Sequence, residues 1–152
     1  MKKTMLTILL CGSMVLGLTG CGKSKNEFDI GNKSDIKISQ NDVAMTIKEE
    51  TLTNKGVTLV LTNNGDKNFQ YGNPYEIEIK KDGEWHKINV ELNFTLPAFG
   101  LKSKESKEIE LNWEHGYGKL AEGTYRIVKG IDYEYEKGKY ETFYVAIEFT
   151  IE

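Results

Sequence analysis

Apolar and polar side chains alternate with a period of two along most of the chain beyond residue 34, which is typical of strands buried on one face. The alternation predicts seven strands, within residues 43–48, 57–62, 75–80, 84–90, 109–113, 125–127 and 143–152. The one helix-like stretch, residues 103–110, merges into the alternation that follows it. Seven short strands in about 115 residues predict an all-β, antiparallel sandwich.

A two-residue turn at Asp82-Gly83 is predicted to join the third and fourth of these strands. Both residues tolerate positive φ, which a type I′ turn requires. The register that follows pairs Glu78 with Lys87, Lys81 with Glu84, Ile77 with Ile88 and Tyr75 with Val90. One face of this hairpin is therefore apolar, and the other carries opposite charges that face each other.

The first 21 residues have the pattern of a bacterial lipoprotein signal. Lys2 and Lys3 precede an apolar stretch that is too short to span a membrane, and the stretch ends in Leu18-Thr19-Gly20-Cys21. We expect residues 1–20 to be removed between Gly20 and Cys21, and a lipid to be attached to Cys21. Residues 21–34 then form a flexible tether and residues 35–152 a single domain, held at the extracytoplasmic face of the cell membrane.

The charge and the cysteine content limit which partners the protein can bind and how its domain can be stabilised. Cys11 and Cys21 are the two cysteines, so the domain beyond the tether has no thiol with which to form a disulfide. Loss of Lys2 and Lys3 takes the net charge from −3 to −5, which argues against nucleic acid and against docking on lipid through a basic face. Two acyl chains on Cys21 would instead provide stable attachment to the membrane.

Catalytic and cofactor-binding motifs are not found in the sequence. It has no Gly-x-Ser-x-Gly elbow, no His-Glu-x-x-His zinc motif and no phosphate-binding Gly-x-x-x-x-Gly-Lys loop. His86, opposite Ile79 in the predicted hairpin, is interpreted as a structural histidine. Carboxylates at 132, 134 and 136 would lie about 7 Å apart on a regular strand, too far apart to share one calcium ion. We therefore predict no enzyme activity, no cofactor and no metal site.

Aromatic side chains give the best hypothesis for binding. The two-residue turn places Trp85 on the polar face beside Lys80, although a one-residue bulge at Gly83 would turn it inward. Trp113 continues an apolar row and is predicted to lie in the core. The candidate binding residues are Trp85, His115, Tyr117, Tyr133 and Tyr135, which would contact a protein, a peptide or a glycan.

Residues 120–127 (Leu-Ala-Glu-Gly-Thr-Tyr-Arg-Ile) resemble the turn into the sixth strand of an immunoglobulin-like or fibronectin-III-like sandwich. Together with residues 71–76, 82–85 and 113–118, the pattern is similar to bacterial Ig-like domains on small lipoproteins of Gram-positive bacteria. The resemblance implies seven strands with Greek-key connections and a tyrosine corner at Tyr125. It does not imply a ligand, because the activity of most members of this family is undetermined.

The sequence therefore favours a lipid-anchored binding module without catalysis. The alternative is a proteinaceous inhibitor of an exported protease or cell-wall enzyme. It comes from a weaker similarity to proteinase inhibitors of bacilli, which share a β-sandwich with a tryptophan before a Gly-x-Tyr strand. An inhibitor would present a rigid, exposed loop and lower protease activity at stoichiometric amounts, whereas a general adhesion module would not.

Overall fold

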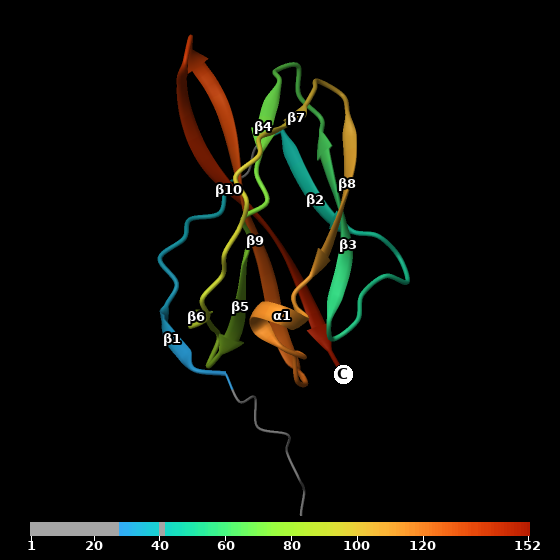
Figure 1. The fold of residues 1–152 in the computed structure, drawn as a ribbon, viewed down its shortest axis with the longest axis vertical. Coiled ribbons are helices and arrows are strands. Elements are labelled where there is room, and N and C mark those ends of the chain that lie inside the picture. Colours follow the sequence, from blue (N-terminus) through green and yellow to red (C-terminus); the bar gives the residue numbers. More distant parts are fainter. Residues whose placement is uncertain (1–27, 40–41) are drawn as a thin grey trace, which may run out of the picture.

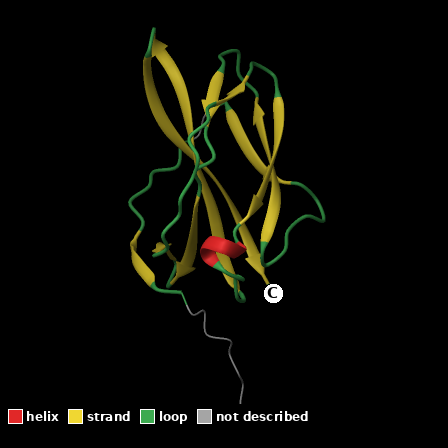
Figure 2. Ribbon diagram, viewed as in Figure 1, coloured by secondary structure: helices red, strands yellow, loops and turns green. Residues whose placement is uncertain are grey.

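Two antiparallel sheets pack face to face in the computed structural model, which describes residues 28–39 and 42–152 (Figure 1). The strands are β1 (Ile30–Lys33), β2 (Val43–Ile47), β3 (Gly56–Asn63), β4 (Phe69–Tyr71), β5 (Glu76–Lys81), β6 (Glu84–Ile88), β7 (Phe99–Leu101), β8 (Ser106–Asn112), β9 (Gly123–Glu136) and β10 (Lys139–Ile151). The one helix in the described residues is a single turn, α1 (Glu114–Tyr117), which stands at one end of the sandwich in Figure 2. The all-β sandwich predicted from the sequence is confirmed.

Strand β9 organises the larger sheet. It pairs with β10 along almost its whole length, and its other edge is shared by two strands. β5 pairs with residues 125–128 and β4 pairs with residues 131–132. β6 and then β1 extend the sheet beyond β5, while β7 extends it beyond β4. The smaller sheet has the order β2-β3-β8.

The core lies between the sheets and is built from the apolar positions of the alternating strands. Leu59 and Leu61 of β3 and Ile127 of β9 are fully buried. Phe149 contacts the rings of both Trp113 and Tyr125, at centroid distances of 5.8 and 5.7 Å. Removal of these side chains from water is the main term that stabilises a domain whose described residues include no cysteine.

All seven predicted strands are present, and the predicted hairpin has its predicted register from Glu78–Lys87 to the turn, but the predicted pairs Ile77–Ile88 and Tyr75–Val90 are not part of its ladder. Asp82 and Gly83 have φ values of 51° and 83°, as a type I′ turn requires. Glu78 pairs with Lys87 and Lys81 with Glu84. No bulge forms at Gly83, so Trp85 pairs with Lys80 on the outer face of the sheet.

Three strands were not predicted: β1, β4 and β7. β1 falls within residues 21–34, which the sequence assigns to the tether, yet Ile30 pairs with Ile88 and packs with Phe28 against the core. The folded domain therefore begins before residue 35. The predicted signal (1–20), its cleavage site at Gly20 and the lipidation site at Cys21 lie outside the described residues.

Residues 34–39, which we call the belt, cross the outer face of the larger sheet from β6 to β10. At one end, the backbone N–H of Ser34 donates a hydrogen bond to the Trp85 carbonyl over 2.8 Å. At the other end, Ile38 forms a parallel bridge with Tyr144, and the Ser39 N–H donates to the Tyr144 carbonyl. The belt covers part of a face that the strand pattern alone assigns to solvent.

Candidate interaction surface

The aromatic residues predicted to bind a partner do not gather into one patch. Trp85 lies near the β5–β6 turn, whereas Tyr135 lies near the tip of the β9–β10 hairpin, at the other end of the sandwich. Along β9, Tyr135 is ten residues from Tyr125, which is about 33 Å on an extended strand. His115 is exposed in α1 and belongs to neither group.

Tyr117 is not exposed, and its predicted role in a surface patch is wrong. Only 4% of the residue is accessible, because the single turn of α1 directs the ring inward against Tyr75. Its hydroxyl accepts a hydrogen bond from the Ile77 N–H over 2.9 Å. Burial raises the pKa of this hydroxyl well above its usual range.

Trp85 is half-buried on the outer face, where its ring contacts two cations. The Lys80 ammonium is 5.0 Å from the ring centroid and the Arg126 guanidinium is 4.8 Å from it. Such cation–π contacts stabilise a packed arrangement. The ring thus forms part of the sheet's outer layer of side chains.

A charge pair lies buried next to Trp85 and beneath the belt. Glu78 is fully buried, and Arg126 Nε donates a hydrogen bond to Glu78 Oε2 over 2.5 Å. The other carboxylate oxygen, Oε1, accepts a hydrogen bond from the Ser34 hydroxyl. The belt therefore covers the Glu78 carboxylate and the Arg126 guanidinium, which would otherwise face water. Through Ser34 it also donates one of the hydrogen bonds that the carboxylate accepts.

The β9–β10 hairpin carries a row of aromatic rings that leads from the core to the surface. Phe69 contacts Phe143 at 5.6 Å, Phe143 contacts Tyr133 at 6.3 Å, and Tyr133 contacts Tyr135 at 6.4 Å. A register shift near the tip leaves Tyr135 opposite no residue of β10, and it is 59% exposed.

The acidic side chains of this hairpin bond to groups within the hairpin. Asp132 accepts a hydrogen bond from Thr142, Glu134 from the Gly138 N–H, Glu136 from Lys139 and Glu141 from Tyr133. Among the described residues, no group of three or more His, Cys, Asp or Glu side chains is arranged to hold a metal ion. These carboxylates therefore all have hydrogen-bond partners within the hairpin.

The second feature of the surface is a gap in the larger sheet. β4 pairs with β7, and β5, which follows β4 along the chain, pairs with β6. No ladder joins the residues that lie between these two pairings. Tyr71 pairs with Phe99 and Glu78 pairs with Lys87, so the short run 72–77 faces the longer run 88–98. The longer run bows away from the sheet and leaves a groove.

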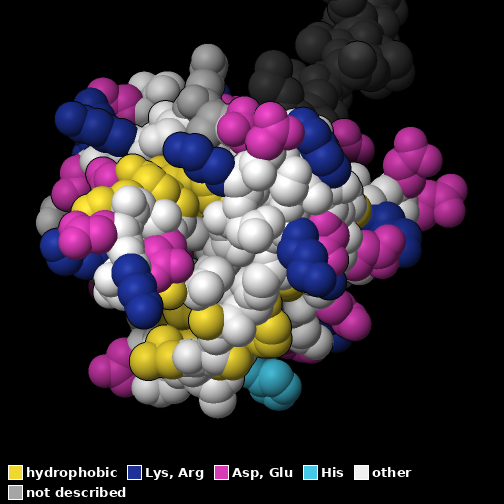
Figure 3. Space-filling model, turned by 90° about the horizontal axis from the view of Figure 1, so that it is seen from above, with side chains coloured by type: hydrophobic (Ala, Val, Ile, Leu, Met, Phe, Trp, Pro, Cys, Tyr) yellow, Lys and Arg dark blue, Asp and Glu magenta, His cyan; other side chains and the backbone are white. Residues whose placement is uncertain are grey.

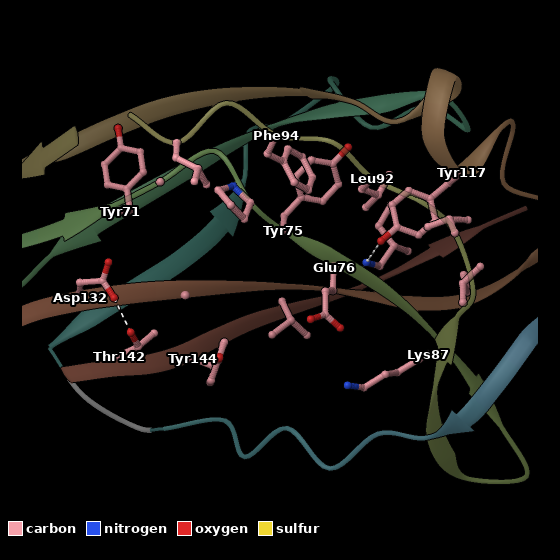
Figure 4. A pocket seen from close by; sticks show the side chains of 18 of the residues that line it. Tyr71, Tyr75, Glu76, Lys87, Leu92, Phe94, Tyr117, Asp132, Thr142 and Tyr144 are labelled. Carbon is pink, nitrogen blue, oxygen red and sulfur yellow. Dashed lines mark hydrogen bonds between the residues drawn. The ribbon is translucent and has the colours of Figure 1, made fainter. Parts of the chain in front are cut away.

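The groove has a volume of about 670 Å³, which is within the range of ligand sites. Figure 4 shows Tyr71, Tyr75, Phe94 and Tyr117 along one side and Glu76, Asp132 and Lys87 on the other. The outer face of β9 and β10 contributes the remaining polar and aromatic groups, including Thr142 and Tyr144. A second hollow of about 500 Å³ shares Glu76, Lys87, Thr142 and Tyr144 and is lined by the belt. The two hollows therefore adjoin.

The side chain of Lys129 is buried beside the gap in the larger sheet. It is 1% exposed, and its ammonium donates hydrogen bonds to the carbonyls of Gly72 and Pro74, at 2.6 and 3.2 Å. These carbonyls lie where the β4–β5 ladder to β9 is broken. Burial lowers the pKa of Lys129 to about 8, because the charged form loses its hydration.

Residues 90–98, which we call the unpaired segment, form the outer wall of the groove. Val90, Leu92 and Phe94 pack against the core, whereas Glu91 and the other intervening residues are exposed. This is the alternation of a strand, but within the described part of the chain its backbone makes no backbone–backbone hydrogen bond. Leu96 in this segment is 85% exposed.

Some apolar side chains are exposed among the charged side chains of the surface. Figure 3 looks along the long axis at the end that carries the β9–β10 hairpin, and hydrophobic side chains emerge there between Lys, Asp and Glu. The exposed large apolar residues are Ile38, Leu96, Phe99, Tyr135, Tyr140 and Tyr144. Leu96 and Tyr144 line the groove, and Ile38 is bridged to Tyr144. The groove and the hairpin thus contain most of the exposed apolar side chains in the described residues.

Tyr125 has the hydrogen bond that a tyrosine corner would make. Its hydroxyl donates to the Ala121 carbonyl over 2.9 Å, at the entry to β9. His86 is half-buried opposite Ile79, and its Nδ1 lies 3.3 Å from the Gly31 carbonyl. Both side chains contribute to the framework and lie outside the groove.

A family model described as a bacterial Ig-like domain matches residues 39–149, from the end of the belt to near the end of β10. No curated protein and no solved structure matched the chain. Among the helices in the described residues, none is long and apolar enough to cross a membrane.

Proposed function

The chain belongs to the bacterial Ig-like domain family, and from this premise we propose that it is a lipid-anchored interaction module outside the cell membrane. Ig-like domains of this kind generally act by binding and without catalysis. The module binds a partner at the cell surface through the groove, the β9–β10 hairpin or both.

The position of the N-terminal end carries this proposal. β1, near the start of the described chain, lies at the end of the sandwich opposite the tip of the β9–β10 hairpin (Figure 1). A lipid on Cys21 would be seven residues from Phe28, within about 25 Å of it even when extended. Anchoring at Cys21 would then keep the β5–β6 turn near the bilayer and present the hairpin outward.

The anchor is tested with Cys21→Ala, because this substitution removes the acceptor of the lipid. We expect the variant to leave the membrane fraction and appear in the medium, while the native chain stays in washed membranes. Cys11→Ala is the matched control, since Cys11 lies in the segment to be removed. Retention of Cys21→Ala in washed membranes would contradict the anchor.

The binding role is tested with photo-crosslinking amino acids on intact cells. We expect partner adducts from positions 96 and 135, which are exposed in the groove and on the hairpin. Position 110, exposed on the smaller sheet, is the control and should give none. Adducts of equal yield at all three positions would show that contact is nonspecific.

One observation supports the alternative, an inhibitor of an exported protease or cell-wall enzyme. The β9–β10 hairpin has carboxylates bonded to its own residues near the tip and presents Tyr135 there in the open, which would suit an inhibitory loop. Titration of secreted proteases and cell-wall hydrolases with the purified domain tests this role. Loss of activity at a one-to-one ratio would establish it.

A further inference from the structure

We propose that the unpaired segment is an open strand edge that receives an extended basic peptide, with the peptide backbone pairing to residues 90–98. This inference rests on the proposed binding function and names the class of partner. It follows from three features of the groove. The backbone of the unpaired segment has no partner strand, the facing run 72–77 cannot pair with it, and the opposite side of the groove carries negative charge.

The backbone of the unpaired segment is available. Val90, Leu92 and Phe94 alternate with exposed residues, so the chain is extended there. Within the described residues, its one hydrogen bond to the facing run joins side chains, from Asn73 Nδ2 to Thr95 Oγ1 over 2.8 Å. An extended chain with unpaired N–H and C=O groups is the template for strand addition.

The gap is held open by the groups on its short side. The ammonium of Lys129 bonds the carbonyls of Gly72 and Pro74, and the Tyr117 hydroxyl accepts the Ile77 N–H. Pro74 has no N–H to offer. The facing run therefore has few groups left with which to pair, and its shorter length prevents a match with residues 88–98.

The side chains that face the unpaired segment select basic residues. The groove contains Glu76 and Asp132, neither of which forms an ion pair with a described residue, and Asp132 bonds only the Thr142 hydroxyl. Lys87 is paired with Asp35, at 3.4 Å. The free charge in the groove is therefore negative, and lysine or arginine in the partner would complement it.

The apolar wall selects aliphatic side chains at the alternate positions of the same peptide. Leu92, Leu96 and Pro97 line the groove on the side of the unpaired segment. Successive side chains of a strand point to opposite faces, so a peptide that alternates apolar and basic residues can meet the wall and the carboxylates together. A glycan has no regular series of amides to pair with the segment, which is why we favour a peptide.

The test uses a blocked decapeptide of alternating lysine and valine, added to the purified domain (residues 21–152) in low salt. We expect saturable binding by calorimetry and amide hydrogen exchange that slows about tenfold within residues 90–98, apart from Pro97, which has no amide hydrogen. A glutamate–valine decapeptide is the charge control, and the lysine peptide with alternate N-methylated amides is the backbone control. Neither control should bind.

Charge selection is tested with the double variant Glu76→Gln and Asp132→Asn. We expect its affinity for the lysine peptide to fall about fivefold, and the fall to shrink as salt is added. Glu110→Gln, on the exposed face of the smaller sheet, should bind as the native domain does. Because both substitutions change exposed or half-exposed groups, thermal unfolding should be unaffected and serves as the check on folding.

Several results would overturn the proposal. Binding of the N-methylated peptide would show that strand pairing is not used, and protection at another strand instead of residues 90–98 would place the edge elsewhere. Self-association with protection of residues 90–98 in the absence of peptide would make a second copy the occupant. Failure of the anchor is distinguishable, since a Cys21→Ala protein that stays in washed membranes leaves peptide binding by the purified domain unchanged.

Discussion

At the residue scale, the buried polar groups are the informative ones. Glu78, Arg126 and Lys129 all lie on central strands of the larger sheet, and each bonds to a partner contributed by another segment. No buried side-chain nitrogen or oxygen among the described residues lacks a hydrogen bond. The burial of these charges is therefore compensated, and removal of one partner should be costly.

Arg126→Met should destabilise the domain by about 3–5 kcal/mol, because it leaves the Glu78 carboxylate buried without its cation. Adding Glu78→Met should recover most of that loss, since an apolar pair replaces the charge pair. The measurement is urea unfolding at neutral pH. Lys48→Met, which breaks the exposed pair with Glu108, is the control and should cost less than about 1 kcal/mol. A cost for Arg126→Met no greater than this control would show that the pair is solvated.

Lys129 should make stability depend on pH above neutrality. Its folded-state pKa of about 8 lies below the ordinary value of 10.5, so the folded chain releases the proton first as pH rises. The stability of the native domain relative to Lys129→Met should therefore increase from pH 7 to pH 10, by about 1–3 kcal/mol. Urea unfolding of both proteins at each pH gives this difference. A difference that does not change with pH would mean that the ammonium is not desolvated.

At the element scale, the sequence is sufficient to predict the strands that are long enough to show alternation and the turn that sets the β5–β6 register. β4 and β7 are three residues each, too short for a period to be visible. The unpaired segment alternates from Val90 to Phe94, so its extended form was visible in the sequence. Whether such a run finds a partner strand depends on distant residues such as Lys129 and Tyr117, which no local pattern reveals.

The candidate site was predicted less well than the fold, because the surroundings of its side chains also depend on residues that are distant in the sequence. Trp85 was placed beside Lys80 by the period of two and the predicted turn, and the structure has this pair. Tyr117 was misplaced because one turn of helix reverses the expected direction of its ring. Glu78 was expected on a charged outer face, and its burial depends on the belt, which crosses the sheet without being part of the strand pattern.

Gly83→Ala tests the turn that fixes the register. Position 83 has a φ of 83° and no atom within 4 Å of an added Cβ, so the substitution strains the backbone and nothing else. We expect a loss of about 1 kcal/mol, measured by thermal unfolding. Gly100→Ala also adds a Cβ in open space, but at ordinary φ, and should be neutral or slightly stabilising. Equal effects at the two positions would show that the turn is not type I′.

At the scale of the whole molecule, the sandwich has two different ends. One end bears the β5–β6 turn, α1 and the start of the described chain, and the other bears the tip of the β9–β10 hairpin (Figure 1). If the proposed anchor holds the first end, distance from the bilayer increases along β9. Binding groups near Tyr135 would then be accessible to large partners.

Labelling of single cysteines on intact cells measures this orientation. Lys137→Cys at the hairpin tip should react with a large polyethylene glycol maleimide about as fast as with a small maleimide. Asp82→Cys in the β5–β6 turn should react with the small reagent and more slowly with the large one, because the bilayer restricts access. Both variants should react alike once the membrane is dissolved in detergent. Equal access in intact cells would contradict the orientation.

The pairing of β1 with β6 has a mechanical consequence. A partner held in the groove and a lipid held in the bilayer would stretch the protein between them, and the force would enter the domain at Phe28. It would be transmitted first to the β1–β6 hydrogen bonds and then, through Ser34, to Glu78 and Arg126 in the middle of the larger sheet. Resistance to such a pull would depend on how fast these contacts rupture, so β1 and the belt would determine the force that the anchored domain withstands.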